Sequence, residues 1–303
     1  VHAKHKASRK EVAIKVFEKA SVQKNPHLMP SIRTERSILR SFEACPSIVS
    51  LWGAFHDAEC LYLVMECVNG GDLQMLIREG LLSETANQEW WRNSCVPHYA
   101  LQLLHAVEFL HRNKIIHMDL KPQNVLITEK GRIQLADFGS AVRMLDGQEN
   151  DSQHKEAGHP TILGATVDFA SPEVLRGTDV SKLTYSADFW SLGCIFHALM
   201  MGESPFHAAS DALALQSIMD YSNGNTALFP SNDESHRKLP GSWKKLIMGM
   251  LHPQPTKRIG VVSADESSIS SSSIGSLIPG YETVDLEAEP PLLPPEPDWV
   301  RAV

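Results

Sequence analysis

The spacing of apolar residues changes along the chain, from short β-branched runs near the start to helical periodicity further on. Short runs of this kind, bounded by polar residues, are typical of strands. The predicted strands are Glu11–Phe17, Ile48–Phe55 and Leu61–Glu66. Between the first two, a run from Pro30 to Leu39 keeps its apolar residues on one side with charges between them, which predicts a helix.

From Val96 onward, apolar residues recur at helical spacing up to Leu110. The same spacing returns in Ala187–Met201 and in Trp243–Leu251. A strand-rich front and a helix-rich back predict an α+β fold with two lobes. The small N-lobe would be β-rich, the large C-lobe helical, and a cleft would lie between them.

Composition divides the chain at about residue 260. Residues 1–68 are predicted to form the small lobe with its connection to the next, and residues 69–260 the large lobe. Residues 261–303 contain the serine run Ser267–Ser273 and the proline-rich stretch Glu287–Pro297, so they are expected to form a disordered tail that contributes little to a core.

The chain has 303 residues, of which 43% are hydrophobic and 21% charged, as in ordinary globular proteins. Its net charge of -8 argues against nucleic-acid binding. The five cysteines show no C-x-x-C spacing, which is typical of a reduced intracellular protein without a zinc site. No apolar run is long enough to cross a bilayer, and the first 20 residues contain no signal peptide. The expected location is the cytoplasm, with the nucleus, or membrane recruitment through regions outside this chain, as alternatives.

Two short sequence motifs contain most of the candidate catalytic and metal-binding residues. Residues 115–124 read I-I-H-M-D-L-K-P-Q-N, and residues 137–139 read D-F-G. Together with V-A-I-K, which ends at Lys15, they resemble the eukaryotic protein kinases over residues 1 to about 260. Ser171-Pro172-Glu173 resembles the A-P-E element of that family, and Arg258 matches the arginine that pairs with its glutamate. Asp188 resembles the buried aspartate that anchors the catalytic loop.

The resemblance implies a serine/threonine protein kinase that uses ATP and Mg²⁺. Asp119 would accept the proton of the attacking hydroxyl, and Lys121 would neutralise charge on the transferred phosphate. Lys15, paired with Glu35, would hold the α- and β-phosphates. Asn124 and Asp137 would supply the hard oxygen ligands that magnesium requires.

The same resemblance implies an adenosine site at the junction of the lobes. Met65 would be the gatekeeper, and the backbones of Glu66 and Val68 would meet the adenine edge. Asp72 would bond the ribose. The full set of expected nucleotide-binding positions besides Lys15 and Glu35 is Ala13, Met65, Glu66, Cys67, Val68, Asp72, Gln123 and Leu126. Leu39, Leu51, His117 and Phe138 match the regulatory spine of the family, and all four also suit an ordinary core.

Several segments are similar in sequence to kinases of the AGC group, notably V-A-I-K-V-F-E-K, I-R-T-E-R and G-A-T-V-D-F-A-S-P-E-V-L. Protein substrates are therefore expected, including activation-loop serines or threonines of other AGC kinases. A small-lobe groove would receive the hydrophobic motifs of such partners. The positions that match this groove are Lys19, Val22, Ile32, Arg36 and Leu61, which also suit ordinary helix and strand residues.

The chain departs from the family pattern in several places. No G-x-G-x-x-G precedes Lys15, so the resemblance implies a small lobe without its first strand and glycine loop. Met118 replaces the arginine that usually pairs with an activation-loop phosphate, here expected at Thr161. Insertions occur near residues 87–97, where Trp90 and Trp91 are expected to pack against the large lobe, and near 146–158, within the activation segment 137–173. The missing glycines leave a pseudokinase or scaffold as the alternative function.

Overall fold

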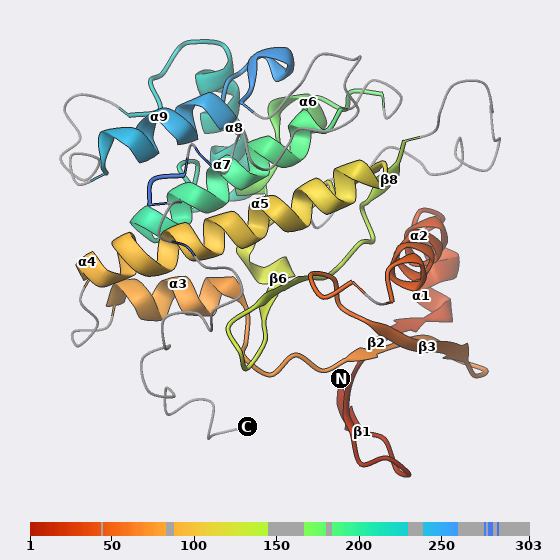
Figure 1. Cartoon of the computed structure of the whole chain (residues 1–303). Helices are drawn as coiled ribbons and strands as arrows, with labels where there is room; N and C mark the ends of the chain where they lie inside the picture. The colour runs from red at the N-terminus through yellow and green to blue at the C-terminus, as the bar shows by residue number, and fades with distance from the viewer. Residues whose placement is uncertain are drawn as a thin grey trace.

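The structure, a computed structural model, describes residues 1–43, 45–82, 88–144, 167–179, 184–229, 239–259, 276, 278–280 and 284. A small β-rich lobe is followed by a larger helical lobe (Figure 1). The predicted two-lobed α+β fold is therefore confirmed. The insertion at 146–158 and the threonines Thr161 and Thr166 lie outside the described residues. None of the helices in the described ranges is long and apolar enough to cross a membrane.

The small lobe contains an antiparallel sheet with the strand order β1-β2-β4-β3. Its strands are β1 (His2–Lys4), β2 (Glu11–Glu18), β3 (Leu51–His56) and β4 (Cys60–Glu66). The register of β2 and β4 pairs Ala13 with Met65 and Lys15 with Leu63. β3 begins at Leu51 rather than at the predicted Ile48, because Ile48 forms an isolated parallel bridge with Leu135 of the large lobe.

Two helices lie beside this sheet, α1 (Lys19–Lys24) and α2 (Leu28–Ser41) (Figure 1). α2 confirms the predicted helix and begins two residues before Pro30, a position near the first turn where proline is tolerated. Its buried side includes Ile38, Leu39 and the carboxylate of Glu35. An acidic side chain on an apolar face needs a partner, and the Glu35 carboxylate meets Lys15 of β2.

The large lobe begins with α3 (Leu73–Leu82), α4 (Gln88–Trp90), the π-helix η1 (Trp91–Cys95) and the long α5 (Val96–Arg112). Trp91 is buried, and its indole Nε1 donates a 2.9 Å hydrogen bond to the Leu199 carbonyl. A Cβ on Gly80 would lie 2.5 Å from the Trp91 ring, so the close packing of α3 depends on glycine there. The expectation that these tryptophans pack against the large lobe is confirmed.

α7 is the central helix of this lobe and is apolar nearly all round, as a fully buried helix should be. The later helices of this lobe in the described residues are α6 (Pro172–Leu175), α7 (Ser186–Met201), α8 (Asp211–Ser222) and α9 (Gly241–Met250). Ile278 and Val284, which belong to the predicted tail, also pack with the large core. Ile278 is buried there and Val284 is half-buried, whereas most of residues 261–303 lie outside the described residues.

Short strands and turns position the residues between the lobes. The strands are β5 (Ile115–Ile116), β6 (Val125–Ile127), β7 (Ile133–Leu135) and β8 (Val142–Arg143). The 3-10 turns are η2 (Pro122–Asn124), η3 (Val167–Phe169) and η6 (Pro255–Lys257). β5 pairs with β8 and β6 with β7, which places the string after residue 116 beside the D-F-G string.

Candidate active site

A buried carboxylate on α7 fixes the loop that follows β5. The side chain of Asp188 is 0% exposed and accepts backbone N–H bonds from His117 (2.9 Å) and Met118 (3.0 Å). Its oxygen also lies 2.8 Å from Nε2 of His111. Burial alone would raise the pKa of Asp188, but its hydrogen bond to His111 and its electrostatic interactions with His111 and His117 lower the pKa below the ordinary value. The loop backbone is therefore held by an ionised carboxylate, the contact expected of Asp188.

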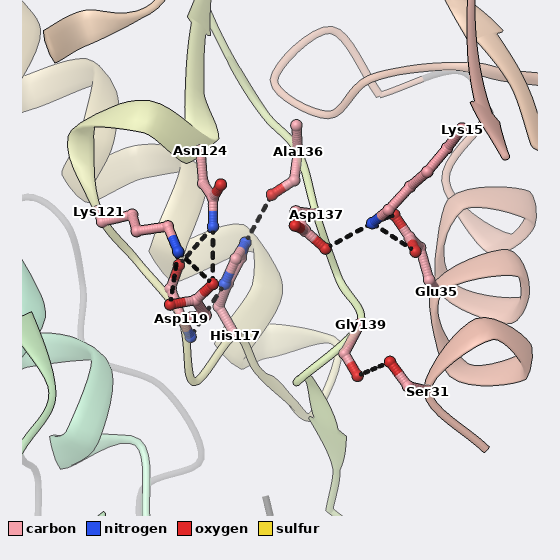
Figure 2. A network of polar contacts seen from close by, with 10 residues as sticks. All are labelled: Lys15, Ser31, Glu35, His117, Asp119, Lys121, Asn124, Ala136, Asp137 and Gly139. Atoms are coloured by element: carbon pink, nitrogen blue, oxygen red, sulfur yellow. Dashed lines mark hydrogen bonds and ion pairs between the residues drawn. The ribbon is translucent and has the colours of Figure 1, made fainter. Parts of the chain in front are cut away.

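Asp119 lies at the centre of a dense set of hydrogen bonds in this loop (Figure 2). Lys121 Nζ donates to its two carboxylate oxygens at 2.9 and 3.2 Å. Asn124 Nδ2 donates to the Asp119 carbonyl at 2.8 Å and to its carboxylate at 3.0 Å. The three residues predicted to act in this loop are thus brought together, and Asp119 is held as an acceptor.

A second set of charges joins the two lobes at Lys15 (Figure 2). Its Nζ lies 2.9 Å from both carboxylate oxygens of Glu35 on α2 and 2.8 Å from Oδ1 of Asp137. The Lys15–Glu35 pair is the predicted one, whereas the direct bond to Asp137 was not predicted. The sequence gives no signal for this bond, because Lys15 and Asp137 are 122 positions apart in the chain.

The three groups of this set shift one another's ionisation. Burial works against the charge of Lys15, yet the carboxylates of Glu35 and Asp137 outweigh it and raise the pKa of Lys15. Burial likewise opposes the charge of Asp137, but Lys15 outweighs it and lowers the pKa of that carboxyl. Burial dominates at Glu35, where it raises the pKa. Lys15 and Asp137 therefore favour their charged forms.

The D-F-G turn is held from both lobes. Ser31 on α2 donates a 2.7 Å hydrogen bond to the Gly139 carbonyl, and a Cβ at Gly139 would lie 2.8 Å from Ser31 Oγ. The His117 ring lies 4.8 Å from that of Phe138, and the four expected spine positions are all buried. Asp137 has a φ of 61°, an uncommon backbone conformation for a non-glycine residue that often marks a functional site. Sequence reasoning missed Ser31, because a serine in a helix has no distinguishing pattern.

The oxygen atoms expected to bind magnesium suit that ion. Asn124 uses its amide nitrogen for both bonds to Asp119, which leaves the hard oxygen Oδ1 as a possible ligand. Asp137 uses Oδ1 for Lys15, and its side chain is 44% exposed, so Oδ2 is accessible. Amide and carboxylate oxygens are the ligands that Mg²⁺ prefers. A bound Mg²⁺ would neutralise phosphate charge.

The expected adenosine positions fall into neighbouring pairs. Ala13 lies directly across from Met65 in the sheet, and Leu126 forms an isolated bridge with Asp72. One Asp72 oxygen accepts the Met75 N–H at the start of α3, which fixes that side chain. Glu66 accepts a weak bond from Gln134, Cys67 Sγ lies 3.1 Å from Asn69 Oδ1, Val68 is half-buried, and Gln123 lies 3.5 Å from Gln74.

Two further predictions concern the edges of the site. The predicted pair of Glu173 and Arg258 is present, with two parallel bonds of 2.5 and 2.8 Å. Met118 is buried and packs in an apolar cluster with Ile116, Val174 and Ala187, and its φ is 68°. Methionine at this position therefore contributes to packing rather than to an anion site.

The expected docking positions lie on α1, α2 and β4 of the small lobe. Val22 and Ile32 are buried, whereas Arg36 is exposed and Leu61 half-buried. Lys19 Nζ donates a 2.5 Å bond to the Asp57 carbonyl. Buried apolar residues beside an exposed arginine are compatible with both the groove and an ordinary helix–sheet contact.

The model of the protein kinase domain matches residues 1–268 of this chain. The chain belongs to the protein kinase family. Its relatives include 3-phosphoinositide-dependent protein kinase 1 of Arabidopsis thaliana, which is 31% identical over 87% of the chain and 49% of that protein. The Homo sapiens protein of the same name is 34% identical over 72% of the chain and 36% of its own length.

Serine/threonine-protein kinase PKH2 of Candida albicans is 31% identical over 76% of the chain and 23% of that protein. These names place the protein kinase domain described here among serine/threonine kinases of the AGC group. The chain spans less than half the length of each of these three relatives. Their activities as whole proteins are properties of longer chains.

Proposed function

We propose that this protein kinase domain is catalytically active and transfers the γ-phosphate of ATP to serine or threonine hydroxyls of protein substrates. The observation that supports this most strongly is the convergence of Asp119, Lys121 and Asn124 through four hydrogen bonds. Asp119 has a carboxylate that can accept a proton, and it lies in the same loop as Asn124, a candidate metal ligand. Phosphoryl transfer needs mainly positioning and charge neutralisation, and these are what the site offers.

In this proposal Lys121 balances the charge of Asp119 until substrate enters, and then faces the transferred phosphate. Lys15, held by Glu35, meets the α- and β-phosphates. Asn124 and Asp137 hold Mg²⁺, which requires Asp137 to exchange its bond to Lys15 for the ion and the nucleotide. Ala13, Met65 and Leu126 contact the adenine, the backbones of Glu66 and Val68 bond its edge, and Asp72 bonds the ribose.

The substrates we propose are activation-loop serines and threonines of other AGC kinases. The likeness to kinases named 3-phosphoinositide-dependent protein kinase 1 supports this class. Docking would use the side of the small lobe that contains Val22, Ile32 and Arg36, with an apolar segment of the partner. The alternative is a scaffold that binds such partners without phosphorylating them.

Transfer of radiolabelled phosphate to a panel of serine, threonine and tyrosine peptides from AGC activation loops tests the proposal. We expect incorporation into the serine and threonine peptides, and a loss of about 100-fold or more in Asp119→Asn, because general-base catalysis alone contributes that much. Asp211→Asn, at the exposed start of α8, is the matched control and should retain activity. If the parent protein gives no more incorporation than Asp119→Asn, the proposed kinase activity is rejected in favour of the scaffold hypothesis.

A further inference from the structure

Three side chains of metal-ligand type meet at the end of the small-lobe sheet. His2 belongs to β1, Glu11 begins β2, and Cys67 directly follows β4. The register pairs His2 with Ala13 and Val12 with Glu66, so the next pair beyond Val12 and Glu66 would place Glu11 across from Cys67. Because alternate residues of a strand share a face, all three side chains lie on the face of Ala13 and Met65.

The distances between their ligand atoms are close to those of a tetrahedral zinc site. His2 Nε2 lies 3.5 Å from Glu11 Oε2, and the two atoms together with Cys67 Sγ all lie within 4.8 Å of one another. Zinc bonds of about 2.0–2.3 Å at tetrahedral angles put neighbouring ligand atoms roughly 3.3–3.6 Å apart. The histidine and glutamate already meet this spacing, and the thiol needs to approach by about 1.5 Å at most.

The ligand types favour zinc over the metal of the nucleotide site. A set of one imidazole, one carboxylate and one thiol is too soft for Mg²⁺, which takes oxygen ligands, and suits Zn²⁺. His2 and Glu11 are exposed and Cys67 is half-buried, so the side chains have room to adjust. A fourth position on the solvent side can be filled by water.

We propose that His2, Glu11 and Cys67 bind one Zn²⁺ ion and so join the edge strand β1 to the segment that links the lobes. β1 is short and pairs with β2 only through His2, Ala3 and Lys4. A bond from His2 to Cys67 through the metal spans the sheet from its edge strand to β4. The site does not include Asn124 or Asp137, but Cys67 is also an expected nucleotide-binding position, so zinc binding is measured without nucleotide.

Cobalt titration of the whole protein under reducing conditions, with magnesium present, tests this site directly. Tetrahedral Co²⁺ with a thiolate ligand gives visible d–d bands and a thiolate-to-cobalt charge-transfer band. We expect both bands to saturate at one equivalent and to disappear when Zn²⁺ is added. Cys67→Ser should remove the charge-transfer band, and His2→Ala or Glu11→Gln should weaken binding by about tenfold or more, since even outer-shell changes cost that much.

Matched controls separate the site from chance binding. Cys60→Ser removes another half-buried thiol of β4, and His5→Ala removes a nearby exposed imidazole. Both should leave the bands and the affinity unchanged. The proposal is overturned if the parent shows no charge-transfer band, if the band survives Cys67→Ser, or if either control variant loses it. Because the readout is spectroscopic, none of these outcomes depends on kinase activity.

Discussion

The two sides of the proposed active site are held in different ways. On the large-lobe side, Asp188 is completely buried and bonds the backbone of the loop that contains Asp119. On the small-lobe side, Lys15 is 32% exposed and divides its charge between Glu35 and Asp137. The first arrangement is fixed by the fold, whereas the second is an ion-pair set that a nucleotide and metal can rearrange. In the proposed function, the loop held within the large lobe positions catalysis, and the ion-pair set between the lobes responds to the nucleotide.

The buried side gives the largest expected effect. Replacing Asp188 with asparagine removes the charge that pairs with His111 and places an N–H₂ group near the His117 and Met118 amides. Breaking a buried pair on one side typically costs about 3–5 kcal/mol, and the retained carbonyl should put this variant near the lower end. Urea unfolding measures the loss, and Asp211→Asn should lie within about 0.5 kcal/mol of the parent. A change below about 1 kcal/mol would contradict a fixed loop.

The Asp188 carboxylate should also make the free energy of unfolding depend on pH. Its pKa is lowered on folding, so its stabilisation is fully present above the unfolded carboxyl value of about 3.9 and is lost as the pH falls through the lower folded value. The difference in unfolding free energy between the parent and Asp188→Asn should therefore shrink below pH of about 4. A free-energy difference that increases as the pH falls would have the opposite sign and would contradict a lowered pKa of Asp188.

Lys15→Met changes the ion-pair set that Lys15 forms with Glu35 and Asp137. We expect loss of phosphate transfer by about 100-fold or more, because the charge that faces the phosphates is gone. Unfolding free energy should change less than in Asp188→Asn, since the Glu35 carboxyl, whose pKa is already raised by burial, can take up a proton. Peptide phosphorylation and urea unfolding measured side by side check this. Lys130→Met, in the exposed turn between β6 and β7, is the control.

Met118→Arg tests why the loop tolerates methionine. An arginine in the cluster of Ile116, Val174 and Ala187 buries charge without a partner, and we expect a loss of about 1–3 kcal/mol in urea unfolding. Met118→Leu keeps the packing and should cost less than about 1.5 kcal/mol. Thr161→Ala should reduce activity more in the Met118→Arg background than in the parent, because only arginine can bind a phosphate there. Equal phosphate dependence in both backgrounds would contradict this reading.

Ser31→Ala gives the smallest expected effect. It removes the bond from α2 to the Gly139 carbonyl, and a net hydrogen bond is worth about 1 kcal/mol. Ser31 is a positioning residue, so we expect KM for ATP to rise several-fold while kcat changes little. Steady-state kinetics separates the two constants. Ser31→Thr should restore the bond and the parent KM, whereas Ser37→Ala, on the exposed side of α2, should change neither.

Sequence alone predicted the parts of the site that lie in short strings or in periodic segments. Asp119, Lys121 and Asn124 are neighbours in the chain, so their convergence follows from one loop. The α2 helix was predictable from apolar spacing on one face, and the role of Glu35 from the resemblance to the kinase family. The Lys15–Asp137 bond and the Ser31–Gly139 bond were not, because each depends on how the two lobes meet. The shift of β3 to Leu51 has the same cause, since Ile48 bridges to Leu135 instead.

Backbone hydrogen exchange tests the contrast between the two sides most directly. Exchange is followed over residues 28–41, 115–125 and 137–139, without ligand and with a non-hydrolysable ATP analogue and Mg²⁺. We predict that the loop held by Asp188 is protected in both states, and that α2 and the D-F-G turn gain protection when the nucleotide is added. Low protection of the loop without ligand, or no gain at α2 with nucleotide bound, would contradict the account.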